Sequence, residues 1–352
     1  MKNDTKCLKT GYISGNGEPL ALPIYQSTTY TYDSTDDIGK LFDLAADGHM
    51  YSRISNPTVA YYEQKLAALE EGIGAVCTTS GQAASFLSLF NICTAGQHFI
   101  ACAKIYGGTY NLFNVTMRRM GIDCTFIDQD ASEDEIQKAF RPNTRAVFGE
   151  SLANPALSVL DIEKLARIAH KNGVPLLVDN TFPTPIFCNP IRFGADIVVH
   201  STTKYLDGHA TCVGGVVIDS GNFVWDKNRY PELTTPDESY HGLTYTESFG
   251  KAAYITKLRV QLIRDLGMYP AAFSAFLTDL GTQTLGVRME RHAKNALTVA
   301  EYLEKRPEIE RVNYPGLESD PYHELAMKYM PDGQSGVMSI VFKGGRNAAV
   351  KF

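Results

Sequence analysis

Long hydrophobic runs are missing from this sequence of 352 residues. The longest apolar stretches, such as Ile197-Val198-Val199, fall far short of the roughly 20 residues that a membrane-spanning helix needs. The opening segment MKNDTKCLKTGY also lacks the apolar core of about 7 to 15 residues that a secretory signal requires. We therefore expect neither a membrane-spanning segment nor a secretory signal.

Paired cysteines are missing as well. The seven cysteines are an odd number, and no two of them have the Cys-x-x-Cys spacing of a zinc ribbon. Neither a disulfide framework nor a metal site is predicted. Most of the cysteines lie in apolar stretches, where a thiol behaves as a small hydrophobic side chain, and a reducing, cytoplasmic location is expected.

Positive charge is too scarce for a polyanionic partner. Lys and Arg total 33 and Asp and Glu total 39, which gives a formal net charge of −6. A mildly acidic protein has no general electrostatic reason to bind nucleic acid or an anionic membrane. The content of hydrophobic residues (44%) and charged residues (20%) is typical of a globular protein and excludes a largely disordered chain.

Nucleotide-binding and hydrolase motifs are also absent. Gly72-Ile73-Gly74 begins a dinucleotide fingerprint, but Cys77 stands where the third glycine belongs. The sequence contains no Walker loop, no His-Glu-x-x-His and no Gly-x-Ser-x-Gly. If the chain forms an α/β sheet, a different ligand must bind at the carboxyl ends of its strands.

Short apolar segments alternate with helical segments through the middle of the chain. Val174 to Asp179 and Asp196 to His200 are nearly continuous apolar runs, which is typical of parallel strands buried on both faces. The pattern predicts an α/β fold with a mostly parallel sheet and helices on both of its faces. The other predicted strands are 74–78, 98–101, 123–127, 146–150 and 213–218, and the predicted helices include 81–93, 110–120 and 161–172.

The flanking regions have other patterns. Residues 1–58 show little periodicity and predict an irregular arm, whereas 226–248 is a polar, proline-bearing stretch of a length typical of a lid or a disordered loop. Helices are expected at 251–266 and 289–305 and a strand at 337–342. Because the sequence predicts the start of another helix at Arg346, just before the last residue, Phe352, we expect the C-terminal region to be incomplete.

Three polar clusters follow predicted strands. They are Thr78-Thr79-Ser80-Gly81-Gln82, Asp179-Asn180-Thr181 and Ser201-Thr202-Thr203-Lys204. In an open α/β sheet the carboxyl ends of the strands converge on one crevice. Each cluster alone also has a purely structural explanation, as a helix cap, a turn or a solvated lysine. Their combination favours a shared site.

Pyridoxal phosphate uses a lysine amine, a carboxylate facing its ring nitrogen and an anion cradle. Lys204 is the candidate amine and Asp179 the candidate carboxylate. The backbone amides of Gly81 and Gln82, at a helix N-terminus, suit a phosphate. The hydroxyl groups of Ser201 and Thr203 add donors, and the ring of Tyr106 is placed to lie on the face of the cofactor.

These residues resemble the Cys/Met-metabolism family of pyridoxal-phosphate enzymes along essentially the whole chain. The motifs that carry the resemblance are Tyr51-Ser52-Arg53, Asn56-Pro57-Thr58, Ser80-Gly81-Gln82-Ala83, Tyr106-Gly107-Gly108-Thr109-Tyr110, Glu150 with Asn154-Pro155, Val178-Asp179-Asn180-Thr181 and His200-Ser201-Thr202-Thr203-Lys204-Tyr205.

The resemblance implies an aspartate-aminotransferase-like (type I) fold. It implies an N-terminal arm of residues 1–58 that contributes to the neighbouring subunit, a cofactor-binding domain of 59–250 and a smaller, incomplete C-terminal α/β domain of 251–352. It also implies a homotetramer built as a dimer of dimers. The family's arginine for the substrate carboxylate lies beyond Phe352.

The same resemblance implies residue roles. Lys204, Asp179 and Tyr106 are the implied catalytic residues: Lys204 binds the cofactor covalently and moves protons, Asp179 pairs with the ring nitrogen, and Tyr106 stacks on the ring. Asn154 contacts the side of the ring that carries the hydroxyl group. The remaining implied cofactor-binding residues are Ser80, Gly81, Gln82, Ser201 and Thr203 in the same chain, and Tyr51 and Arg53 toward the phosphate of the neighbouring subunit.

Within the family, the stretches 106–113, 218–225 and 266–277 are most similar to the O-acetylhomoserine sulfhydrylase branch. That likeness implies γ-replacement on O-acetylhomoserine with sulfide or a thiol, giving homocysteine or methionine. Methionine γ-lyases usually carry cysteine at Gly108, and cystathionine γ-synthases usually lack the stretch 226–248. These two activities, and a fold relative that binds a ligand without catalysis, remain as alternatives.

Overall fold

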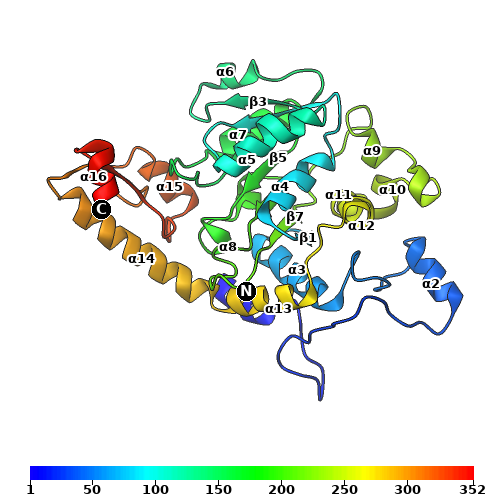
Figure 1. Cartoon of the computed structure of the whole chain (residues 1–352). Coiled ribbons are helices and arrows are strands. Elements are labelled where there is room, and N and C mark those ends of the chain that lie inside the picture. The colour runs from blue at the N-terminus through cyan, green and yellow to red at the C-terminus, as the bar shows by residue number, and fades with distance from the viewer.

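The computed structural model describes residues 1–352 and contains two β-sheets with helices around them (Figure 1). The strands are β1 (Gly74–Thr78), β2 (His98–Cys102), β3 (Asp123–Ile127), β4 (Thr144–Glu150), β5 (Leu176–Asp179), β6 (Ile197–His200), β7 (Gly215–Asp219), β8 (Ile309–Asn313) and β9 (Ser339–Phe342).

Most of the remaining regular structure is α-helical. The α-helices are α1 (Asn3–Lys9), α2 (Thr35–Phe42), α3 (Pro57–Glu70), α4 (Gly81–Phe90), α5 (Gly107–Asn111), α6 (Glu133–Gln137), α7 (Ile162–Lys171), α8 (Thr184–Phe187), α9 (Pro231–Thr234), α10 (Tyr245–Phe249), α11 (Ala253–Lys257), α12 (Arg264–Leu266), α13 (Ala272–Gln283), α14 (Leu285–Glu304), α15 (His323–Tyr329) and α16 (Gly345–Lys351). Two π-helical stretches, η1 (Leu112–Met117) and η5 (Leu258–Ile263), and three 3₁₀ turns, η2 (Pro190–Phe193), η3 (Glu238–Tyr240) and η4 (Gly250–Ala252), complete the chain.

The large sheet has seven strands in the order β1-β7-β6-β5-β4-β2-β3. β7 pairs antiparallel with β1 and β6, and all other neighbours are parallel, which confirms the predicted mostly parallel α/β sheet. The central strands β5 and β6 consist of buried aliphatic residues almost throughout, as parallel strands between helical layers require. The carboxyl ends of β1, β6, β5 and β4 therefore point to the same edge of the sheet.

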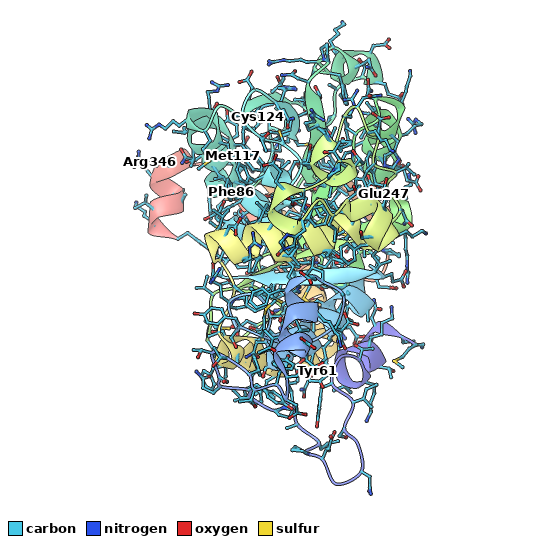
Figure 2. All side chains as sticks on the ribbon, turned by 90° about the vertical axis from the view of Figure 1, so that its right-hand side faces the viewer. Tyr61, Phe86, Met117, Cys124, Glu247 and Arg346 are labelled. Atoms are coloured by element: carbon cyan, nitrogen blue, oxygen red, sulfur yellow. The ribbon has the colours of Figure 1, made fainter.

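Two hydrophobic cores hold the chain together. The large core contains 68 buried residues around the seven-stranded sheet and includes Tyr254 and Leu258 from α11 and η5. A small core joins the end of α14 to β8 and contains Ala296, Ala300, Ile309, Val312, Tyr314 and Leu317. Figure 1 shows α14 running from the main body to this second unit, with α15 and α16 at its far end. Arg346 marks α16 at the margin of the molecule in Figure 2.

The arm is more ordered than its composition predicts. Helix α1 packs against α3, α13 and α14 and buries Cys7, and α2 starts at Ser34, whose hydroxyl oxygen accepts from the N–H of Asp37 at 3.1 Å. The prediction of an irregular arm over residues 1–58 is therefore wrong for these two helices. Short helices are hard to see in a sequence because few apolar residues are enough to anchor them.

The stretch 226–248 is neither a free lid nor disordered. Tyr230, Leu233 and Tyr245 are fully buried in the large core, and the hydroxyl group of Tyr230 donates to the carbonyl oxygen of Arg145 at 2.7 Å. Figure 2, where Glu247 marks α10, shows this region beside the helix formed by α11 and η5. The polar composition of the stretch gave no indication that these three side chains are buried.

The sulfur atoms are mostly inside the molecule. All seven cysteines are free, and only Cys212 is more than slightly accessible. Burial raises the pKa of Cys7 to about 11 and the pKa values of Cys93 and Cys102 to about 12. None of the helices combines the length and apolar character needed to cross a lipid bilayer.

Candidate active site

A cavity of about 240 Å³ lies at the carboxyl edge of the large sheet. Its wall brings together side chains from all three polar clusters, from Ser80 through Asp179 to Lys204, which is 124 positions after Ser80 in the sequence. The lining residues are Ser80, Gly81, Gln82, Ser85, Tyr106, Thr109, Glu150, Leu152, Asn154, Asp179, Thr181, Phe182, Ser201, Thr203, Lys204 and Val213.

Helix α4 begins at this cavity. Ser80 is its N-cap, and the Ser80 hydroxyl oxygen accepts from the N–H of Ala83 at 3.1 Å. The N–H groups of Gly81 and Gln82 have no carbonyl of their own helix within reach, because they belong to its first turn. A Cβ atom on Gly81 would lie 2.6 Å from the Cβ of Ser201, so only glycine lets these two segments approach. This arrangement leaves backbone donors and a positive helix end facing the cavity.

Asp179 ends β5 and contributes a carboxyl group to the wall. One of its oxygens, Oδ1, accepts from the N–H of Thr181 at 2.9 Å and from the Thr181 hydroxyl at 2.5 Å. Burial raises the pKa of Asp179, while the bonds from Thr181 and the charge of His200 oppose that rise. The Thr181 hydroxyl oxygen also accepts from the N–H of Ser201 at 2.9 Å, which ties the ends of β5 and β6 together.

Glu150 is a second carboxyl group in the wall, and the sequence reasoning gave it no role. It ends β4 and pairs in register with Asp179 on β5. Its Oε1 accepts from the N–H of Tyr106 at 2.7 Å and its Oε2 from the N–H of Asn154 at 3.2 Å. Burial, followed by the charge of Asp179, raises the pKa of Glu150 to about 8. Glu150 thus fixes the backbones of two predicted site residues and holds a proton at neutral pH.

Lys204 lies in the turn that follows β6, and its side chain is exposed. The turn is fixed by Thr203, whose hydroxyl group donates to the carbonyl oxygen of Gly214 at 3.2 Å and accepts from the Gly214 N–H at 3.0 Å. The Thr203 hydroxyl is therefore already engaged within the chain. Ser201 lines the cavity between this turn and the start of α4.

Tyr106 caps α5 and is half exposed at the cavity. Gly108 makes room for this ring and for Gln82, because a Cβ at Gly108 would lie 2.5 Å from Cε1 of Tyr106 and 2.9 Å from Nε2 of Gln82. The Gln82 amide donates to the Thr109 hydroxyl oxygen at 3.3 Å, while its own Oε1 is buried without a partner.

Tyr51 and Arg53 do not line this cavity. They lie in the arm, both exposed, with the Arg53 guanidinium 5.3 Å from the centre of the Tyr51 ring. Together with Tyr30, Tyr32 and Phe42 they line a separate, mostly apolar hollow. One chain therefore assembles nine of the eleven predicted site residues, Ser80, Gly81, Gln82, Tyr106, Asn154, Asp179, Ser201, Thr203 and Lys204, and leaves the two arm residues elsewhere.

The residues present fit pyridoxal phosphate. The wall offers one amine (Lys204), a carboxyl group across from it on the next strand (Asp179), and free N–H groups where α4 starts, with space that a Cβ on Gly81 would fill. The sequence reasoning placed Thr181 in a cluster at the crevice but gave it no role, and it missed Ser85, Thr109, Leu152, Phe182 and Val213 as lining residues. Thr181 had a signal, since it follows Asp179 by two positions and an Asx turn joins such residues.

Comparison with known proteins agrees with this site. Residues 4–352 match the model of the family described as "Cys/Met metabolism PLP-dependent enzyme". The O-acetyl-L-homoserine sulfhydrylase of Leptospira meyeri is 46% identical over 341 residues, which are 94% of this chain and 77% of that protein. The homocysteine synthase of Schizosaccharomyces pombe is 46% identical over 334 residues, 94% of this chain and 78% of that protein.

A solved structure extends the similarity to three dimensions. The crystal structure of a candidate O-acetylhomoserine (thiol)-lyase from Campylobacter jejuni superposes with a TM-score of 0.94 at 37% identity. The match covers 97% of this chain and 86% of that one, and the Campylobacter structure contains N'-pyridoxyl-lysine-5'-monophosphate. The expected type I α/β fold is confirmed, and the chain belongs to the Cys/Met metabolism family of pyridoxal-phosphate-dependent enzymes.

Proposed function

We propose that this enzyme catalyses γ-replacement on O-acetylhomoserine, with sulfide or a thiol as the incoming nucleophile. The observation that carries the proposal is the single cavity lined by Lys204, Asp179 and the start of α4. The names of the relatives, O-acetyl-L-homoserine sulfhydrylase and homocysteine synthase, support the choice of substrate.

The reaction exchanges one substituent on the γ-carbon. The bond from the γ-carbon to the acetate oxygen breaks, a carbon–sulfur bond forms, and acetate leaves with its bonding electron pair. Sulfide gives homocysteine, and methanethiol gives methionine. Bound pyridoxal phosphate supplies the electron sink that makes the α-proton and then a β-proton of the amino acid acidic.

Lys204 has two tasks in this proposal. Its Nζ atom would hold the cofactor covalently, and the same amine would take up and return protons at the α- and β-carbons of the amino acid. The bonds between Thr203 and Gly214 fix the turn that carries this lysine. The Asp179 carboxylate would accept a hydrogen bond from the ring nitrogen and so stabilise its protonated form.

The other cavity residues bind and orient. The N–H groups of Gly81 and Gln82, together with Ser80 and Ser201, would hold the phosphate, and Tyr106 would pack on the ring. Thr203 would join them by turning its hydroxyl proton from the carbonyl oxygen of Gly214 to the phosphate. Asn154 contacts the side of the ring that carries the hydroxyl group. The apolar side chains of Leu152, Phe182 and Val213 exclude water from the wall.

The assembly is part of the same proposal. We place residues 1–58 as an arm that carries Tyr51 and Arg53 to the phosphate site of a neighbouring chain, within a cytoplasmic homotetramer built as a dimer of dimers. The exposure of both side chains, and their absence from the lining of the cavity in their own chain, support this arrangement. Residues 59–250 then form the cofactor-binding domain, and 251–352 belong to the C-terminal domain.

Steady-state kinetics tests the activity. We expect kcat/KM for O-acetylhomoserine plus sulfide to exceed the values for methionine alone, for O-succinylhomoserine plus sulfide and for O-succinylhomoserine plus cysteine. Faster release of 2-oxobutyrate and methanethiol from methionine would identify a γ-lyase instead. Faster formation of cystathionine from cysteine would identify the γ-synthase, and a protein that stays colourless with added cofactor would be a binding relative without catalysis.

A further inference from the structure

A buried pair of hydrogen-bonded side chains, His200 and Glu70, lies behind the candidate site. The Nε2 atom of His200 is 2.7 Å from Oε1 of Glu70, and each side chain is only 1% exposed. Glu70 is the last residue of α3 and His200 the last residue of β6. Neither residue lines the cavity, so the pair cannot touch a ligand there directly.

The Glu70 carboxylate joins the two strands that carry the main site residues. Its Oε1 also accepts from the Nδ2 group of Asn180 at 2.8 Å. Asn180 directly follows Asp179 at the end of β5, and His200 directly precedes Ser201 at the end of β6. One carboxylate therefore fixes the residue next to the candidate ring acid and the residue next to the turn of Lys204.

The hydrogen bonds around Glu70 satisfy both of its oxygens. Asn189 donates to Oε2 at 3.2 Å, and Asn180 donates a second bond to the carbonyl oxygen of Cys188 at 2.8 Å. Burying a carboxylate is costly unless it is paired with a positive charge or bound by donors. His200 is the one basic side chain in hydrogen-bonding contact with Glu70.

A second acid, Asp179, lies near His200. Asp179 pairs with Val199 on the neighbouring strand, one residue before His200. The charge of His200 lowers the pKa of Asp179 against the effect of burial. The other ring nitrogen of His200, Nδ1, is buried without a hydrogen-bond partner, so the ring has no further anchor than Glu70.

Two other ionisable groups lie near the pair. Cys188 is buried beside Glu70, and burial raises its pKa well above the usual value. The guanidinium of Arg192 is directed to the neighbouring Glu71, with 2.9 Å between Nε and Oε2. Within the cavity, Glu150 has a pKa of about 8 and holds a proton at neutral pH.

We propose that Glu70 and His200 act as a positioning pair that holds Asp179 in the orientation in which it would meet the ring nitrogen of the cofactor. Glu70 binds Asn180, the residue after Asp179, and His200, the residue before Ser201, so one carboxylate fixes the ends of both strands. The inference rests on the proposed function, because Glu70 and His200 support Asp179, whose contact with the ring nitrogen is itself part of that proposal.

The test uses holoenzyme loaded with pyridoxal phosphate labelled with ¹⁵N in its ring. The ring-nitrogen chemical shift reports whether that atom is protonated, independently of turnover. We expect Glu70→Gln and His200→Gln each to move the resonance toward that of a neutral pyridine, in the same direction as Asp179→Asn. We also expect kcat to fall by about 10- to 100-fold, the usual effect of removing a partner that orients a group in contact with the ligand.

The chain offers a matched control in the same helix. Lys65 of α3 pairs with Asp279 of α13 at 2.5 Å, and both side chains are 5% exposed. Asp279→Asn therefore breaks an equally buried ion pair that has no connection to Asp179. It should lower thermal stability as the Glu70 variant does but leave the nitrogen resonance where it is.

The outcomes separate the hypotheses. If the single variants do not fold, the double variant Glu70→Gln/His200→Gln removes both charges together and leaves no unpaired buried ion, and it should still shift the resonance. If the ring-nitrogen resonance moves in Asp179→Asn but not in the Glu70 and His200 variants, the role of the positioning pair is refuted and the role of Asp179 stands. An unshifted resonance in Asp179→Asn would overturn the role of Asp179 and with it this part of the proposed function.

Discussion

Gly81 and Ser201 approach so closely that a Cβ atom on the glycine would lie 2.6 Å from the Cβ and 2.9 Å from the Cα of the serine. The first residue opens α4 and the second follows β6, so their contact sets the width of the candidate phosphate cradle. Because the clash involves backbone, it cannot be relieved by turning a flexible side chain.

Gly81→Ala should therefore weaken cofactor binding. Overpacking of this kind costs about 1–3 kcal/mol, which corresponds to roughly a 5- to 150-fold higher Kd. The Kd is measured by titrating cofactor-free enzyme with pyridoxal phosphate. Gly39→Ala is the control, since a Cβ at Gly39 of α2 meets no atom within 4 Å. Equal affinity in both variants would show that the cradle does not depend on this contact.

Lys204→Ala should abolish covalent attachment of the cofactor and reduce turnover by at least about 10²- to 10⁴-fold, the usual contribution of a positioned acid–base group. Borohydride reduction followed by peptide mass spectrometry should place the cofactor on Lys204 in the wild type and on no lysine in the variant. The exposed Lys251, which lies outside the cavity, provides the control Lys251→Ala. A cofactor adduct that persists in the Lys204 variant would contradict the assignment.

Arg53→Ala should raise the Kd of the cofactor, and its defect should be repaired from another chain. In a dimer with shared sites, pairing this variant with Lys204→Ala leaves one intact site, so a 1:1 mixture should recover about a quarter of wild-type activity. The activity of the mixture is measured after dissociation and reassembly. If purified heterodimers carrying one chain of each kind stay inactive, Arg53 does not serve a neighbouring site.

Asp219 should make the fold less stable as the pH rises. Burial raises its pKa to about 7, and its Oδ2 has no hydrogen-bond partner. The unfolded chain releases this proton near pH 4, so between about pH 4 and 7 the folded state binds more protons and the free energy of unfolding falls with pH. From pH 5 to 7.5 this group accounts for about 2–3 kcal/mol.

Asp219→Asn should flatten that pH dependence, as measured by urea unfolding of the holoenzyme at both pH values. Its amide oxygen can still accept from the N–H of Gly221, which donates to Asp219 at 2.8 Å in the wild type. Asp332→Asn, at an exposed position, should leave the dependence unchanged. Equal slopes in the wild type and the Asp219 variant would mean that this carboxyl group is ionised in the folded state at pH 5.

The sequence was sufficient for those parts of the fold that rest on local pattern. The apolar runs ending at Asp179 and His200 predicted β5 and β6, and the polar residues after them predicted the cavity. β8 was missed because only two residues of Ile309–Asn313 are buried. Its exposed residues Glu310 and Arg311 are adjacent, so buried and exposed positions do not alternate as they do in a typical half-buried strand.

The remainder of the site depends on contacts between distant segments. Glu150 lies beside Asp179 only because of the register between β4 and β5. Glu70 and His200 are 130 positions apart, and no spacing in the sequence connects them. Residues proposed to contact the ligand lie in short polar motifs directly after strands and can be recognised in the sequence. Residues that support them through contacts between distant segments can be identified only from the three-dimensional structure.

The burial of the cysteines has a chemical consequence for an enzyme whose proposed co-substrate is sulfide. Thiolates, not thiols, exchange with sulfur reagents, and the interior of this chain keeps Cys7, Cys93 and Cys102 protonated at neutral pH. These three sulfur atoms therefore do not compete with sulfide as nucleophiles, and the carbon–sulfur bond of the proposed reaction is left to the incoming reagent.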